Sequence, residues 1–200
     1  MTLIDAIHSY KQYELLAHVE LDDVIIKVSE ELLEMLEAKA QPDALELKKE
    51  MADTVANILS ASAEVGCIPD EGRLTTKAEV SDSELLMGMK HWIQDLQSVR
   101  NRYSRRQISQ EALTASTEEF LSLVLSYGGS QQSLEEILAY VGKKFSQRIE
   151  DYKPDLDLKS FIAEYPDFPK APVLFRDVSP LLMSPEAMQY LCFELAAKAQ

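Results

Sequence analysis

The chain has 200 residues, 46% of them hydrophobic and 27% charged, which is enough for the core of one globular domain or of one domain plus part of another. Its formal net charge of −14 argues against non-specific binding to nucleic acids or anionic membranes, and we expect neither as a partner. Cys67 and Cys192 are isolated, no apolar run is long enough to span a bilayer, and no apolar signal core follows the N-terminus, so we expect a reduced, cytoplasmic protein.

Apolar residues recur at helical spacing through most of residues 1–153, which predicts an all-α fold of the helical-bundle type. The first two amphipathic stretches cover residues 4–18 and 22–39. Pro42 suits the first turn of the next helix, and Gly66 is a candidate C-cap for it.

Three Ser-x-x-Glu patterns predict the starts of later helices, because serine and glutamate at this spacing can satisfy the free amides of a first turn. These pairs are Ser81 with Glu84, Ser116 with Glu119, and Ser133 with Glu136. Gly128-Gly129 is expected to end the middle helix, and Pro154 to close the series.

The composition changes at residues 154–200, which contain six of the eight prolines. Prolines there flank a short β-like run, Val173-Leu174-Phe175, and residues 185–198 are predicted to form a closing helix. We expect a domain boundary between residues 153 and 154.

Two pairs of acids at helical spacing are the main candidate site. Glu31 and Glu34 lie beside the apolar stripe of one predicted helix, and Glu50 and Asp53 lie beside that of the next. Residues i and i+3 share a helix face, so antiparallel helices could direct four carboxylates to one point. Converging carboxylates require a cation, for which Mg²⁺, or alternatively Mn²⁺, is the natural choice. Ordinary solvated helix faces carry the same spacing, and that interpretation stays open.

The motifs Glu30-Glu31-Leu32-Leu33-Glu34 and Glu50-Met51-Ala52-Asp53 resemble those of the MazG-like, all-α nucleotide pyrophosphohydrolases. The resemblance implies Mg²⁺-dependent cleavage between the α and β phosphates, giving a nucleoside monophosphate and pyrophosphate. It also implies that Glu31, Glu34, Glu50 and Asp53 are metal ligands. We assign Glu34 a second role as the general base. A homodimer or homotetramer is expected, because helical pairs of this kind complete their cores by association.

Four further residues are candidates for substrate binding: Lys27, Asn57, Lys144 and Arg148. Lys27 precedes Glu31 by one turn, and Asn57 follows Asp53 by one turn. The late-helix basic residues match a place where the resembled family holds phosphate, although a basic last turn that complements the helix dipole explains them equally well.

Other conspicuous side chains are assigned structural roles. Trp92 has the spacing of a core residue, although stacking on a base is the alternative. Three histidines, His8, His18 and His91, have no partner at metal-ligand spacing. A basic run is expected to end a helix and to meet acids on a partner subunit; it comprises Arg100, Arg102, Arg105 and Arg106.

The segment from about residue 156 to 200 resembles the beginning of adenine phosphoribosyltransferase, through Pro166-Asp167-Phe168-Pro169-Lys170 and the run from Phe175 to Leu182. The resemblance implies base binding by Leu174, Phe175 and Arg176. The ribose-phosphate loop and the central parallel sheet of that family are missing from the sequence, so we expect a truncated fusion without transferase activity of its own.

Two alternatives to the hydrolase remain. In the first, the helical part is an accessory nucleotide-binding module of a phosphoribosyltransferase fusion in purine salvage. In the second, it is a structural dimerisation domain with incidental acids. The sequence does not distinguish the base of the nucleotide.

Overall fold

The computed structural model describes residues 2–17, 20–41, 43–100, 107–128 and 134–198. Across these ranges it has eight α-helices and one two-stranded sheet, which confirms the all-α class. The chain divides into two compact units. The first comprises Met1–Lys11 and Val19–Ser146, and the second comprises Gln12–His18 and Gln147–Gln200. None of the described helices combines the length and apolar character that crossing a bilayer requires.

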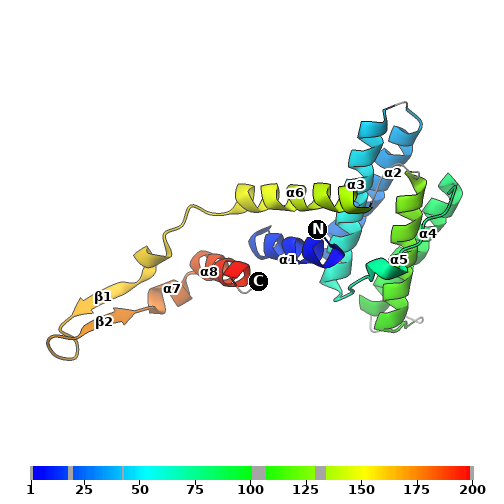
Figure 1. The fold of residues 1–200 in the computed structure, drawn as a ribbon. Helices are drawn as coiled ribbons and strands as arrows, with labels where there is room; N and C mark the ends of the chain where they lie inside the picture. Colours follow the sequence, from blue (N-terminus) through cyan, green and yellow to red (C-terminus); the bar gives the residue numbers. More distant parts are fainter. Residues whose placement is uncertain (1, 18–19, 42, 101–106, 129–133, 199–200) are drawn as a thin grey trace. The chain divides into compact units, whose positions relative to one another are not determined.

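The first unit is organised around a hairpin of two long helices, α2 (Leu21–Lys39) and α3 (Ala44–Glu64), which pack side by side (Figure 1). Asp43 caps α3, because its side chain accepts hydrogen bonds from the backbone amides of Leu45 and Glu46. The apolar stripes of both helices are buried against each other and the rest of the unit, as their sequence spacing predicts.

The end of α3 is a Schellman motif. Gly66 adopts a left-handed φ of 69°, and its amide donates to the carbonyl of Ala63 at 3.1 Å. The amide of Cys67 donates to the carbonyl of Ser62 at 2.8 Å. The predicted role of Gly66 is therefore confirmed, whereas Pro42 lies outside the described residues.

A second helix pair, α4 (Asp82–Arg100) and α5 (Gln110–Tyr127), completes this bundle. The capping box predicted for α4 is present: the Ser81 amide donates to Glu84 Oε2 at 2.9 Å, and the Glu84 amide donates to Ser81 Oγ at 3.3 Å.

The predicted start of α5 at Ser116 was wrong. The helix begins at Gln110, and Ser109 is its N-cap, accepting from the Ala112 amide at 3.2 Å. Ser109 offers the same hydroxyl chemistry as Ser116 and precedes good helix formers, so the helix starts at the earlier cap.

The long connection between α3 and α4, which includes the 3-10 turn Glu71–Arg73, is fastened along α5. Side chains spaced one turn apart on α5 accept hydrogen bonds from the backbone of the connection. The pairs are Asp70 N to Glu118 Oε1 at 2.9 Å, Thr75 N to Ser122 Oγ at 3.0 Å, and Lys77 N to Ser126 Oγ at 2.8 Å. Residues four apart share a helix face, so one stripe of α5 satisfies a stretch of otherwise irregular backbone.

Two helices contribute to both units, α1 (Leu3–Ala17) and α6 (Leu134–Tyr152). Within the first unit the rings of Tyr10 and Phe145 meet edge to face at 5.7 Å. The predicted cap Ser133 lies outside the described residues. The division between units falls inside α6, after Ser146, so the expected boundary at residues 153/154 stays a prediction.

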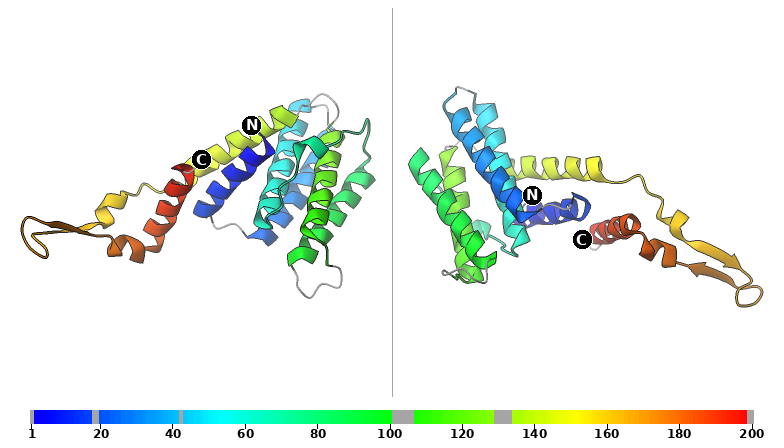
Figure 2. Two further views of the ribbon diagram at one scale, coloured as in Figure 1. Left: turned by 60° about the horizontal axis from the view of Figure 1, so that its bottom comes forward. Right: turned by 180° about the vertical axis from the view of Figure 1, so that it is seen from behind.

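The second unit contains an antiparallel hairpin of β1 (Ala163–Pro166) and β2 (Leu174–Asp177), drawn side by side in Figure 2. Tyr165 pairs with Phe175 in the register. The helical elements that lie wholly in this unit are the 3-10 turn Leu158–Phe161, α7 (Ser179–Met183) and α8 (Pro185–Lys198). The β-like run and the closing helix were predicted, whereas the first strand was not.

Candidate metal centre

Three of the four predicted acids converge across the α2–α3 hairpin. One carboxylate oxygen from each of Glu31, Glu50 and Asp53 lies within 4.8 Å of the other two. Glu31 comes from α2 and is only 8% exposed, while Glu50 and Asp53 come from one face of α3 and are half-buried. The arrangement follows from i, i+3 spacing on α3 and from the antiparallel packing of α2 against it. No other such group occurs among the residues that the structure describes.

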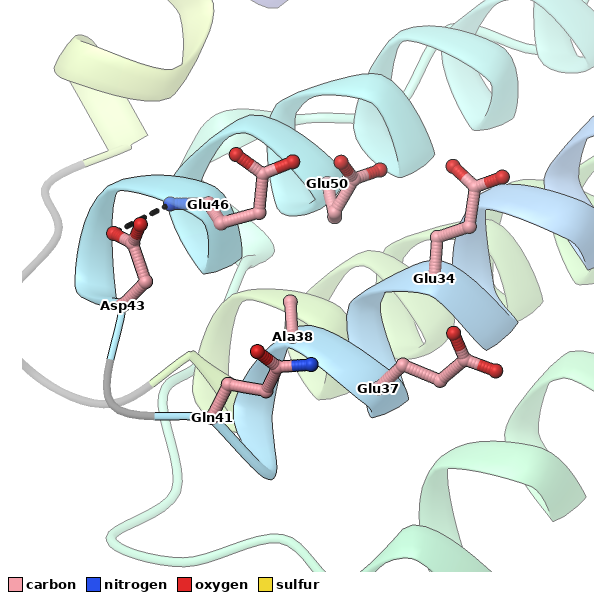
Figure 3. A pocket seen from close by; sticks show the side chains of 7 residues that line it. All are labelled: Glu34, Glu37, Ala38, Gln41, Asp43, Glu46 and Glu50. Carbon is pink, nitrogen blue, oxygen red and sulfur yellow. Dashed lines mark hydrogen bonds between the residues drawn. The ribbon is translucent and has the colours of Figure 1, made fainter.

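Glu34, the fourth predicted ligand, lies outside this group of three. Its side chain is exposed, and it shares with Glu50 an open groove of about 310 Å³ between the two helices. Figure 3 shows the Glu34 and Glu50 carboxyl groups projecting from α2 and α3 into the same end of this groove. Glu34 is therefore placed beside the candidate ligands rather than among them. The remaining groove-lining residues are Glu37, Ala38, Gln41, Asp43 and Glu46.

Crowding of carboxyl groups changes their acidity. Burial, followed by the charges of Glu34, Glu31 and Asp53 and a hydrogen bond with Glu34, raises the pKa of Glu50 to about 7. Burial, followed by the charge of Asp53, also raises the pKa of Glu31. Both shifts mean that the fully ionised cluster is unfavourable without a cation.

One ammonium group enters the cluster. Lys144 on α6 places its Nζ 2.5 Å from Asp53 Oδ1, and both side chains are about four-fifths buried. Asp53 Oδ1 is nevertheless a buried oxygen with no hydrogen bond of acceptable geometry among the described residues. The two observations agree if the contact is a charge pair rather than an aligned hydrogen bond, which is how we interpret it.

These residues meet the requirements of a divalent-cation site. All three candidate ligands are carboxylates, the hard oxygen donors that Mg²⁺ and Mn²⁺ prefer. Glu31 is buried, and no described side chain makes an ion pair with it. An acid buried in this way is costly when ionised unless a cation compensates it.

Two other residues predicted to bind substrate, Lys27 and Asn57, make their ion pair and hydrogen bond with groups other than the three candidate ligand carboxylates. Lys27 pairs with Glu30 at 2.7 Å, although its charge also reaches Glu31 and Glu34. Asn57 is buried, and its Nδ2 donates to the Asp53 carbonyl at 2.9 Å, so its amide is partly used within its own helix.

Arg148 belongs to the second unit, where its guanidinium lies over the Tyr13 ring at 5.5 Å. Its role in phosphate binding therefore stays a prediction.

Tyr140 is a further residue close enough to feel the charges of the acid cluster, and the sequence analysis did not single it out. It is half-buried on α6, and burial together with the charges of Asp53 and Glu50 raises its pKa. Its spacing could have indicated this position, because Tyr140 precedes Lys144 by four residues and therefore lies on the same helix face.

The structural role assigned to Trp92 is confirmed. Trp92 is fully buried, and its Nε1 donates to Thr117 Oγ1 at 3.1 Å, which places it in the core. Arg100 was expected to meet an acid on a partner subunit, but it pairs with Asp22 of its own chain. Both side chains are exposed, so the expected contact of this run with a partner subunit stays a prediction. The other arginines of that run, Arg102, Arg105 and Arg106, lie outside the described residues, as does His18; His8 and His91 are exposed.

The predicted base-binding residues form most of β2. Phe175 is 43% exposed and lies 5.4 Å from the Phe168 ring, measured between centroids. Arg176 Nε donates to Glu164 Oε1 at 2.8 Å across the hairpin, and Leu174 is exposed. The hairpin therefore presents an aromatic surface, but whether it binds a base stays a prediction.

Comparison with known proteins gives short matches to adenine phosphoribosyltransferases. The chain is 47% identical over 45 residues to that enzyme from Thermosipho melanesiensis, covering 22% of this chain and 26% of the relative. It is 64% identical over 33 residues to the Synechococcus enzyme, covering 16% and 19%. A Picosynechococcus enzyme is 48% identical over 50 residues, covering 22% and 29%. The chain thus spans about a quarter of the length of these relatives.

These matches support the resemblance of the C-terminal segment to the N-terminal region of adenine phosphoribosyltransferase. No family model and no solved structure matches the chain. The resemblance of residues 1–153 to pyrophosphohydrolases consequently rests on its acidic motifs and stays a prediction.

Proposed function

We propose that the first unit binds Mg²⁺ or Mn²⁺ through Glu31, Glu50 and Asp53 and hydrolyses a nucleoside triphosphate, or a related nucleotide, between its α and β phosphates. The observation that carries this proposal is the convergence of three carboxylate oxygens within 4.8 Å, one of them from a side chain more than nine-tenths buried. The products would be a nucleoside monophosphate and pyrophosphate.

The residues around the cluster supply the other requirements of the reaction. A divalent cation held there would neutralise phosphate charge and activate the attacking water. Glu34, exposed in the groove beside Glu50, is positioned to accept the proton of that water on a carboxylate oxygen. Lys144 would provide positive charge for the phosphates of the substrate.

A second candidate function is favoured by the short matches to adenine phosphoribosyltransferases. In this alternative the chain belongs to a purine-salvage fusion, and the helical unit is an accessory module that binds a metal–nucleotide complex without cleaving it. It uses the same acid cluster, so the two functions differ in turnover rather than in binding.

One experiment separates these functions. Purified protein is incubated with a panel of canonical and modified nucleotides with and without Mg²⁺, and pyrophosphate release and nucleotide binding are both measured. Mg²⁺-dependent release supports the hydrolase, and Mg²⁺-dependent binding without release supports the accessory module. Nucleotide binding is measured as a rise in melting temperature. If neither metal nor nucleotide raises the melting temperature and no pyrophosphate is released, both proposals fail and a structural role is left.

A further inference from the structure

Lys144 contacts a carboxylate oxygen of Asp53, which is one of the three candidate metal ligands. Its ammonium nitrogen is 2.5 Å from Asp53 Oδ1, and the contact lacks hydrogen-bond geometry. Mg²⁺ binds carboxylate oxygens at about 2.0–2.1 Å, so an ammonium group and a metal ion cannot both contact this oxygen at these distances without strong repulsion.

The fold permits this lysine to move while its helix stays in place. The neighbouring α6 residues Val141 and Phe145 are fully buried in the first unit, which anchors the backbone. Near the start of α6, Glu136 pairs with Lys48 of α3 at 2.7 Å. A lysine side chain has four rotatable bonds, so its ammonium group can leave Asp53 while the backbone remains fixed.

The charges favour such an exchange. Within the described residues, Lys144 makes the only ion pair with Glu31, Glu34, Glu50 or Asp53, since Lys27 pairs with Glu30. One ammonium compensates four carboxyl groups poorly, and a divalent cation would compensate them better. Once released at the edge of the cluster, the ammonium would meet the anionic part of a substrate held there.

We infer that Lys144 is an exchangeable counter-ion: it neutralises Asp53 in the metal-free protein, is displaced when a divalent cation binds, and then binds a phosphate group of the substrate. This inference rests on the proposed metal site. It assigns Lys144 opposite effects on two ligands, because the side chain competes with the metal and cooperates with the phosphate. It also predicts that metal binds before the polyphosphate.

The test uses Mn²⁺ alone and then inorganic pyrophosphate, each measured by isothermal titration on the full chain. Lys144→Met should tighten Mn²⁺ binding about tenfold, a common size for coupling between two bound groups, and should weaken pyrophosphate binding at saturating Mn²⁺ by a similar factor. Lys143→Met is the matched control, since it removes the same charge from an exposed neighbour on α6. Lys144→Arg, which retains a charge, should keep Mn²⁺ affinity close to that of the wild type.

A second measurement needs no mutation. Amine acetylation followed by mass spectrometry should show that Mn²⁺ increases the reactivity of Lys144 relative to Lys143, and that added pyrophosphate reverses the increase. Unchanged reactivity, or equal Mn²⁺ affinity in the wild type and Lys144→Met, would overturn the exchange while leaving the metal site intact. If neither protein binds Mn²⁺, the proposed function itself fails and the inference fails with it.

Discussion

Glu31 and Asp53 are contributed by different helices, yet their carboxylate oxygens lie within 4.8 Å of each other. The contact depends on the antiparallel packing of α2 and α3 and on the side of each apolar stripe that carries the acid. Glu31 is buried there, so it is not an ordinary solvated surface acid.

The α3 acids are the first target for mutation. Glu50→Gln and Asp53→Asn should each reduce Mg²⁺-dependent pyrophosphate release by at least about a hundredfold, since each removes a ligand charge from the site. Circular dichroism should show unchanged helix content. Glu119→Gln, at an exposed position on α5, is the control and should keep full activity. Retained activity in both α3 variants would remove the metal assignment.

Stability of the metal-free protein should depend on Glu50. Its folded-state pKa of about 7 lies above the ordinary 4.5, so the folded chain binds more protons than the unfolded chain between these values. The stabilising contribution is complete below pH 4.5 and is lost as the pH rises through 7. After allowance for solvent screening, we expect a loss on the order of 1 kcal/mol in the free energy of unfolding.

Urea denaturation at several pH values measures this effect, and Glu50→Gln should flatten the decline. If the free energy of unfolding falls with pH in Glu50→Gln as it does in the wild type, groups other than Glu50 cause the fall.

Catalysis offers a separate readout of Lys144. Lys144→Ala should raise KM by about tenfold and lower kcat much less, because it removes binding shared by the ground and transition states. Steady-state kinetics at saturating Mg²⁺ provide the measurement, with Lys143→Ala as the control. An unchanged KM would count against contact with the substrate.

The hydrogen bond of the buried Trp92 indole should stabilise the core of the first unit. Thr117→Val removes the acceptor of the Trp92 Nε1 hydrogen bond and should lower the free energy of unfolding by about 1–3 kcal/mol. Thr117 Oγ1 also donates to the Leu113 carbonyl, so part of the loss is independent of Trp92. A double-mutant cycle with Trp92→Phe isolates the pair, and a coupling energy near zero would show that the hydrogen bond contributes nothing.

The C-terminal segment, residues 155–200, should not be needed for hydrolysis. Deleting residues 155–200 should leave pyrophosphate release within about twofold of the full chain, because none of the proposed metal ligands lies in that segment. Activity and helix content are measured together. A deletion variant that stays folded but loses activity would show that the segment contributes to the reaction.

Several structural features could be predicted from neighbouring residues in the sequence alone. The box formed by Ser81 and Glu84, the left-handed turn at Gly66 and the long amphipathic helices all depend on nearby residues, and the structure contains them as predicted. The misplaced start of α5 shows the limit of this approach. Ser109 and Ser116 offer the same hydroxyl, and spacing alone does not rank them.

The residue pattern alone specified helices that carry acids beside their apolar stripes, since periodicity and side-chain chemistry are properties of neighbouring positions. Which acids meet depended on packing between segments distant in the chain. Packing grouped Glu31 with Glu50 and Asp53, left Glu34 exposed in the groove, and brought Lys144 from α6 to Asp53. Distances of this kind follow from the way whole helices fit together, and no local spacing encodes them.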